Sequence, residues 1–197
     1  MFIVLIMPAI AMADPLDTAT LFYKRGDYKA ALEYLQPMAN QGNASAQTML
    51  AYMYSAGLGA ERNYSESVSW YRKAAEQHNS NAQLNLGELY FHGEGVKQDY
   101  PEALKWFKLA AEQDDKTAQA ALAGMYTKGL GTEKDKAEAY FWLLLAARSG
   151  NISYVAALKI MELSPDTELP PDKAAIAKAR AAAWKPMAGV TIKDPRE

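Results

Sequence analysis

"GEGVKQD" at residues 93–99 is a glycine-rich phrase that the chain contains in three versions. The other two are GLGAERN at 57–63 and GLGTEKD at 129–135, and both glycines of the phrase recur every 36 residues. A fixed period of about 20 to 50 residues is the signature of a repeat architecture, because each unit buries its apolar face only against its neighbours. The period therefore predicts an array of similar units.

Each unit contains two amphipathic helical patterns. In the unit 80–115, Ala82, Leu86 and Tyr90 are four residues apart and share one helical stripe. The second half of the unit repeats an alanine, a tryptophan (Trp106) and an alanine pair at helical spacing. The same pattern recurs in the units 44–79 and 116–151, with Ser67 in place of the alanine in the first of these. We therefore expect three helix pairs, each joined by one glycine phrase.

The residues around the glycine phrase predict where the helices end and begin. Gly93 stands where a first helix would end, and glycine adopts the required positive φ without steric cost. Asp99 follows as an N-cap, with Glu102 three residues later as in a capping box. A phosphate-binding loop is not supported, since no Gly-Lys-Ser/Thr follows any copy.

The pattern continues beyond the three units. Residues 14–43 contain a shorter helix pair, whose second helix begins at Tyr28 in the register of the later units. Residues 152–186 are expected to form capping helices, one over 152–163 and a closing one that begins at Pro171–Asp172. Such atypical ends are expected, since a terminal unit must cover its neighbour's apolar face. Residues 187–197 are expected to be a tail.

The first 13 residues resemble a signal peptide. An apolar run ends on Ala11-Met12-Ala13, which fits signal-peptidase cleavage after Ala13, although no Lys or Arg precedes the run. The run is too short to span a membrane. We therefore expect a periplasmic or secreted protein whose mature form begins at Asp14.

The composition excludes several functions. The chain has no cysteine, which rules out disulfides, thiolate zinc sites and thiol catalysis. Its 21 Lys and Arg nearly balance 23 Asp and Glu, so nothing favours nucleic acid. We expect no cofactor, no metal and no membrane span, and a chain that is monomeric on its own.

These motifs resemble the Sel1-like repeat, a relative of the tetratricopeptide repeat. The unit 80–115 carries the pattern most fully, at thirteen positions: Ala82, Gln83, Leu86, Gly87, Tyr90, Gly93, Gly95, Asp99, Tyr100, Ala103, Trp106, Ala110 and Ala111. The pair at 14–43 looks like a tetratricopeptide unit. The resemblance implies an all-α fold, a right-handed α-solenoid of antiparallel helix pairs that binds a protein or peptide partner.

In tetratricopeptide folds the first helix of each pair lines a concave groove, which suggests a partner site on its variable face. We expect this face to include Thr117 and Gly124, and we expect Tyr52 and Phe91 to contact no neighbouring unit. The candidate partner-binding residues are Tyr52, Leu84, Glu88, Phe91, His92, Thr127 and Lys128. Their apolar members suggest a partner surface rather than a solvated face.

Catalysis has little support in the sequence. The two histidines, His78 and His92, lack a zinc-binding context, and no Ser-x-x-Lys or Gly-x-Ser-x-Gly phrase occurs. Some cysteine-rich Sel1-like relatives are associated with β-lactam binding or hydrolysis, so a cell-wall or β-lactam hydrolase is an alternative, which we disfavour. A structural subunit of an envelope assembly is another. The tryptophans are expected to pack between helices rather than to stack on sugars.

Overall fold

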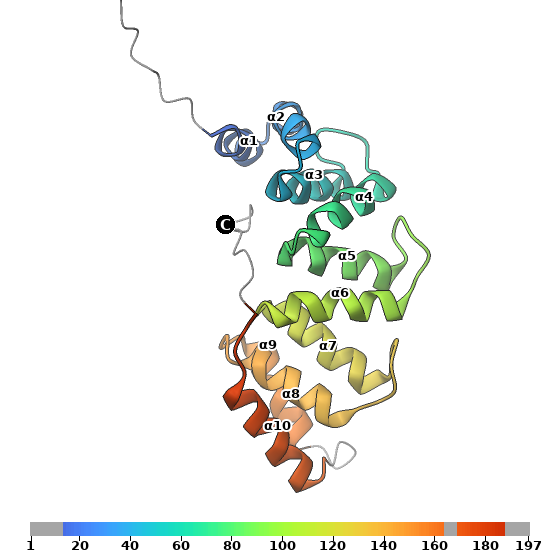
Figure 1. Cartoon of the computed structure of the whole chain (residues 1–197), viewed down its shortest axis with the longest axis vertical. Coiled ribbons are helices and arrows are strands. Elements are labelled where there is room, and N and C mark those ends of the chain that lie inside the picture. Colours follow the sequence, from blue (N-terminus) through green and yellow to red (C-terminus); the bar gives the residue numbers. More distant parts are fainter. Residues whose placement is uncertain (1–13, 164–168, 188–197) are drawn as a thin grey trace, which may run out of the picture.

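A computed structural model describes residues 14–163 and 169–187 of the chain, and these residues form ten helices and no strand. The expected signal peptide (1–13) and all but the first residue of the expected tail (187–197) lie outside the described residues. Figure 1 shows the helices stacked along one long axis. Within the described ranges, no helix has the length and apolar character that a membrane crossing needs.

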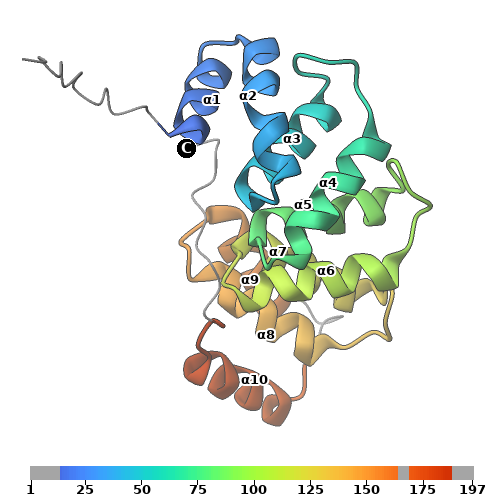
Figure 2. The same ribbon diagram turned by 45° about the horizontal axis from the view of Figure 1, so that its top comes forward.

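The helices occur as consecutive pairs. Their bounds are α1 Pro15–Lys24, α2 Tyr28–Asn40, α3 Ala44–Ala56, α4 Tyr64–Glu76, α5 Ser80–His92, α6 Tyr100–Glu112, α7 Lys116–Lys128, α8 Lys136–Ala147, α9 Ile152–Leu163 and α10 Pro171–Ala183. The helices from α1 to α8 pack as four pairs, and each second helix also packs against the first helix of the next pair (Figure 2). The predicted all-α, right-handed solenoid is confirmed.

Both glycines of each phrase have a structural reason. Gly93 ends α5 with φ of 74°, and Gly95 adopts φ of 71° in the loop that follows. A Cβ at Gly95 would lie 2.5 Å from the backbone of Tyr64, the first residue of α4 in the preceding unit. The second glycine therefore allows two units to approach closely, and Gly59 and Gly131 meet Tyr28 and Tyr100 in the same way.

The expected caps are present. The Asn79 side chain accepts a hydrogen bond from the Ala82 backbone N–H at 2.9 Å, at the start of α5. The Asp99 carboxylate accepts one from the Glu102 N–H at 3.0 Å, at the start of α6. Each bond satisfies one N–H that the helix itself leaves unpaired.

A row of glutamines joins successive units. The Gln83 amide on α5 donates to the Ala75 carbonyl at the end of α4, and its own oxygen accepts a hydrogen bond from Gln113 at 2.7 Å. Gln47 makes the equivalent bonds with Ala39 and Gln77. In the next unit Gln119 donates to Ala111, but Ser149 stands where a glutamine would follow. Within the described residues, the buried Gln119 Oε1 consequently has no hydrogen-bond partner.

The tryptophan ladder is buried. Trp70 and Trp106 are each 7% exposed and Trp142 is 4% exposed, so the expected packing role between helices is confirmed. In the first unit Tyr34 takes the tryptophan position on α2. It stacks on Phe22 of α1 and remains 43% exposed.

The C-terminal helices depart from the regular pairing. Helix α9 packs on α8, as expected for one more first helix, but α10 packs mainly on α8 as well (Figure 2). The Arg148 side chain donates to the Ala181 carbonyl of α10, and the Met187 N–H donates to the Glu112 carbonyl of α6 at 2.8 Å. The closing segment thus runs back along the array instead of pairing with α9.

The incomplete glutamine row predicts that Ser149→Gln is more stable than Ser149→Met. Both variants lose the hydrogen bonds of the Ser149 hydroxyl with Ala146 and Asn151. Only the new amide can donate to the unpaired Gln119 oxygen, which should raise the free energy of unfolding by about 1 kcal/mol over the methionine variant. Thermal unfolding followed by circular dichroism measures the change. Ser149→Met, which has similar length but no donor, is the control, and equal stability of the two variants would contradict the interpretation.

Trp106→Ala should lower the free energy of unfolding by about 3–5 kcal/mol, because a large buried ring is lost. Urea unfolding followed by circular dichroism gives the value. Tyr34→Ala removes a half-exposed ring from the same repeat position and should cost clearly less. If the two variants lose the same stability, the tryptophan ladder is not what holds the units together.

Candidate functional site

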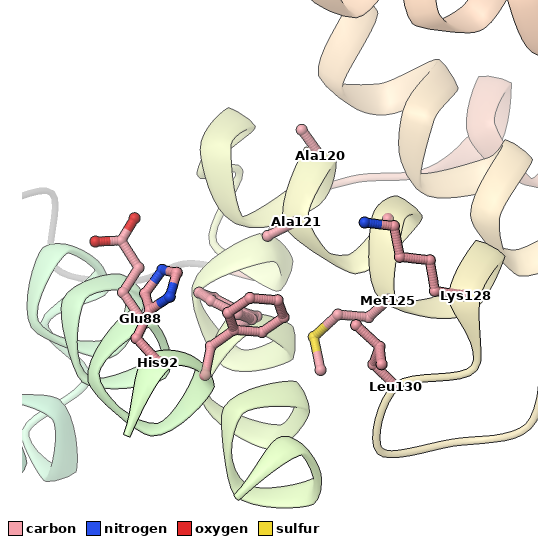
Figure 3. Close-up of a pocket in the computed structure, with 10 residues that line it drawn as sticks. Glu88, His92, Ala120, Ala121, Met125, Lys128 and Leu130 are labelled. Carbon is pink, nitrogen blue, oxygen red and sulfur yellow. The ribbon is translucent and has the colours of Figure 1, made fainter. Parts of the chain in front are cut away.

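A pocket of about 270 Å³ lies between the first helices of two successive units, α5 and α7 (Figure 3). Its lining residues come from α5, α6, α7 and the loop after α7. They are Glu88, Phe91, His92, Phe107, Ala120, Ala121, Gly124, Met125, Lys128 and Leu130.

The pocket has an apolar floor and a charged rim. Phe91 is half-buried, with its ring 5.3 Å from that of Tyr100 and 6.4 Å from that of Phe107, and Met125 is buried. Figure 3 shows Glu88 and His92 on one side of the pocket and Lys128 on the other. The three rim side chains are exposed. The pocket can therefore enclose an apolar group while charges lie at its mouth.

The structure brings several of the predicted site residues together. Glu88, Phe91, His92 and Lys128 all line the pocket, as does Gly124 from the same expected face. Thr127 is exposed on α7 but lies outside the pocket lining, and its hydroxyl donates to the Ala123 carbonyl at 2.7 Å. Thr117 is exposed at the other end of α7.

The expectation that Leu84 faces an open groove is wrong. Leu84 is 7% exposed and belongs to the hydrophobic core. The equivalent residue one unit earlier, Thr48, is 5% exposed. Burial at both positions shows that this part of α3 and α5 is enclosed, so Leu84 stabilises the array, whereas the equivalent residue of α7, Ala120, lines the pocket.

Tyr52 contacts the preceding unit, contrary to the expectation that it contacts none. Its ring lies 6.4 Å from that of Tyr23 on α1 in an edge-on arrangement. Tyr52 is not part of the pocket lining. Phe91 contacts α6 of its own unit, so truncation of either ring should destabilise the fold.

Sequence reasoning missed the pocket floor. Phe107 comes from the second helix, where the neighbouring units have Tyr71 and Leu143 at the same repeat position. Met125 and Leu130 belong to positions that the repeat pattern assigns to the core and the loop. The available signal was Gly124, because a glycine in a helix interior is costly unless something requires it.

Two helical glycines at neighbouring repeat positions have opposite surroundings. A Cβ at Gly87 would lie 2.7 Å from the Phe107 ring, so tight packing explains this residue. A Cβ at Gly124 would meet nothing within 4 Å. Packing therefore does not explain why position 124 is a glycine. Because Gly124 has no side chain, the α7 backbone is open to the pocket at this position.

This contrast predicts opposite effects of the same substitution. Gly124→Ala should raise the free energy of unfolding by about 0.5–1 kcal/mol, through the higher helix propensity of alanine. Gly87→Ala should lower it, because crowding of the Phe107 ring costs about 1–3 kcal/mol and exceeds that gain. Chemical denaturation of both variants tests the pair. A stabilised Gly87→Ala protein would contradict the packing shown here.

The described residues contain no group of three or more His, Asp or Glu side chains that could hold a metal ion. His78 is an exposed residue with φ of 62° at the turn after α4. Burial raises the pKa of Tyr126, and Glu138 and Asp135 raise it further. A raised pKa keeps that phenol protonated, whereas a nucleophile needs the opposite shift.

A family comparison matches the Sel1 repeat at residues 21–43, 44–79, 80–115 and 116–151. The last three ranges have the same bounds as the three units defined by the glycine phrases. The first match lies within the helix pair 14–43. No curated protein shows significant sequence similarity to the chain.

Solved structures share both fold and sequence with the chain. A Sel1 repeat protein from Oxalobacter formigenes is 33% identical, with a TM-score of 0.72 over 85% of this chain and 69% of that one. A protective antigen of uropathogenic Escherichia coli strains with an SLR fold is 32% identical, with a TM-score of 0.73 over 85% of this chain and 37% of that one. The Sel1 repeat fold is generally a scaffold for protein–protein interaction. With four matched repeats on one continuous helical array, the chain belongs to the Sel1 repeat family.

Proposed function

We propose that the chain is a non-enzymatic adaptor that binds a peptide or protein partner along its first helices, with the pocket between α5 and α7 as the main anchor point. The observation that carries the proposal is the opening at Gly124. A glycine in a helix interior lowers the stability of the helix, and at position 124 no close packing contact requires one. Gly124 also borders an apolar pocket. A partner that approaches the α7 backbone would explain why a glycine is present at this position.

The size of the pocket favours a side chain over a free small molecule. Pockets for drug-sized ligands have volumes of about 300–1,000 Å³, and this one, at about 270 Å³, lies below that range. Protein interfaces gain most of their binding energy from a few large side chains that enter such pockets. The apolar floor of Phe91, Phe107 and Met125 suits an aromatic or aliphatic anchor.

The rim charges would orient the partner. Lys128 stands across the pocket from Glu88 and His92, so the mouth presents opposite charges on its two sides (Figure 3). A partner segment with an acidic residue near Lys128 would complement this arrangement. Rim charges of this kind contribute more to the association rate and to specificity than to affinity.

Peptide selection tests the proposal. A phage-displayed library of random dodecapeptides is selected on the purified protein, and the peptide returned is synthesised with a fluorescent label. Gly124→Leu fills the pocket from an open position and should weaken binding of this peptide by about 1–3 kcal/mol, the range of an interface hot spot. Fluorescence anisotropy gives the dissociation constants.

The matched control is Thr127→Leu, which adds apolar volume at an exposed position of α7 outside the pocket lining. It should leave peptide affinity nearly unchanged. Failure to select any peptide, or equal effects of the two substitutions, would reject the pocket as a partner site.

The same proposal places the protein in the periplasm or outside the cell, on the basis of the sequence at 1–13. Cleavage after Ala13 should give a native protein whose N-terminal sequence is Asp-Pro-Leu-Asp. Edman sequencing of the protein from a periplasmic extract checks this. Recovery of a protein with Met1 retained, in the cytosolic fraction alone, would refute export.

A further inference from the structure

The wall that α5 and α6 contribute to the pocket is aromatic. The ring of Phe91 lies 5.3 Å from that of Tyr100 and 6.4 Å from that of Phe107, at interplanar angles of 63° and 54°. The His92 ring lies edge-on to Phe91 at 5.0 Å. Aromatic rings prefer such tilted and edge-on neighbours, because the positive edge of one ring meets the negative face of the next. A further ring can join this cluster from the pocket side.

The repeat itself does not require a ring at the position of Phe91. The neighbouring units carry Ser55 and Thr127 at this position, so small polar side chains are compatible with the stacking of units. Phe91 is half-buried and lines the pocket. The aromatic wall is therefore a feature of this pocket rather than of every unit.

The opposite side of the pocket also favours an aromatic guest. Met125 and Lys128 lie across the pocket from Glu88 (Figure 3). A thioether makes favourable contacts with aromatic rings, and an ammonium group is attracted to the face of a ring, most strongly to that of tryptophan. The chain itself contains such a pair on α4, where the Lys73 Nζ lies 3.8 Å from the centroid of the Trp70 ring. An aliphatic guest would use neither interaction.

The volume of the pocket and its carboxylate favour an indole over a phenyl ring. An apolar cavity of about 150 Å³ already holds benzene, whereas this pocket has a volume of about 270 Å³. A bicyclic ring fills that space better than a single ring. A buried indole N–H also needs an acceptor, and the carboxylate of Glu88 is part of the pocket lining.

Building on the proposed function, we infer that the side chain that enters the pocket is a tryptophan of the partner, and that its indole N–H donates to Glu88. Phe91, Phe107 and Met125 contact the ring system. Lys128 stabilises it from the other side of the pocket. The partner is thus a protein or peptide with an accessible tryptophan.

The library selection tests the identity of the anchor. Peptides selected on the protein should share a tryptophan, and replacing it by leucine in the labelled peptide should raise the dissociation constant at least about tenfold, as for other hot-spot residues. Selection on Gly124→Leu is the control, because its pocket is filled. Tryptophan enrichment on this variant as well, or selected peptides that share leucine or isoleucine instead, would overturn the inference.

The hydrogen bond to Glu88 is tested with 1-methyltryptophan in the same peptide, which keeps the ring but lacks the donor. On the unmodified protein this change should raise the dissociation constant about threefold to tenfold, the range for one hydrogen bond. On Glu88→Ala both peptides should bind equally. Glu94→Ala is the matched control, since Glu94 is exposed just beyond α5 and outside the pocket lining. It should preserve the difference between the two peptides.

The outcomes separate this inference from the proposed function. A tryptophan anchor whose methylation effect disappears on Glu88→Ala supports both. An equal methylation effect on both proteins is steric and overturns the contact with Glu88. A peptide with an aliphatic anchor that Gly124→Leu weakens overturns the tryptophan and leaves the pocket as the partner site. Self-association that Gly124→Leu abolishes, measured by analytical ultracentrifugation, would assign the pocket to a second copy and overturn the inference.

Discussion

The structure depends on the glutamine bond between successive units. Gln83 donates to the Ala75 carbonyl near the end of α4, and this carbonyl also accepts a hydrogen bond from the His78 N–H in the turn after the helix. The bond sets the rotation of α5 on α4, and the close approach of Gly95 to Tyr64 sets their separation. Gln119 fixes α7 on α6 in the same way. The pocket between α5 and α7 forms where both helices pack on α6.

The residues that hold successive units together leave one face of each first helix that can vary in sequence. The core stripe repeats as Leu50, Leu86 and Leu122, all fully buried. On the opposite face the same repeat position is Tyr52, Glu88, Gly124 and Ile160 along the array. Tyr52 packs on Tyr23 of the preceding unit, whereas Glu88 and Gly124 at the same repeat position line the pocket. The fold therefore provides the scaffold, and these substitutions provide the binding surface.

Much of the fold follows from the amino-acid sequence, because each unit supplies the same spacing evidence independently. The 36-residue period, the caps at Asn79 and Asp99, and the bounds of α9 all follow from residue types and their spacing. Inter-unit contacts are harder to predict. Periodicity shows that Leu84 is off the main stripe, but not that neighbouring units enclose it, nor that Tyr52 meets Tyr23 across units. The packing of α10 on α8 could not be predicted from the sequence either, since its contacts are long-range and occur in one copy only.

The claim that the first helices form the partner surface is tested most directly by site-specific photo-crosslinking in cells. A benzophenone amino acid is placed at position 127, which is exposed on α7 outside the pocket lining and next to Lys128 of the rim, and at position 108, which is exposed on α6 and outside the pocket lining. Our account predicts one discrete crosslinked protein from position 127 and none from position 108. Crosslinks from position 108 alone would contradict it, because the partner would then bind a different face of the array.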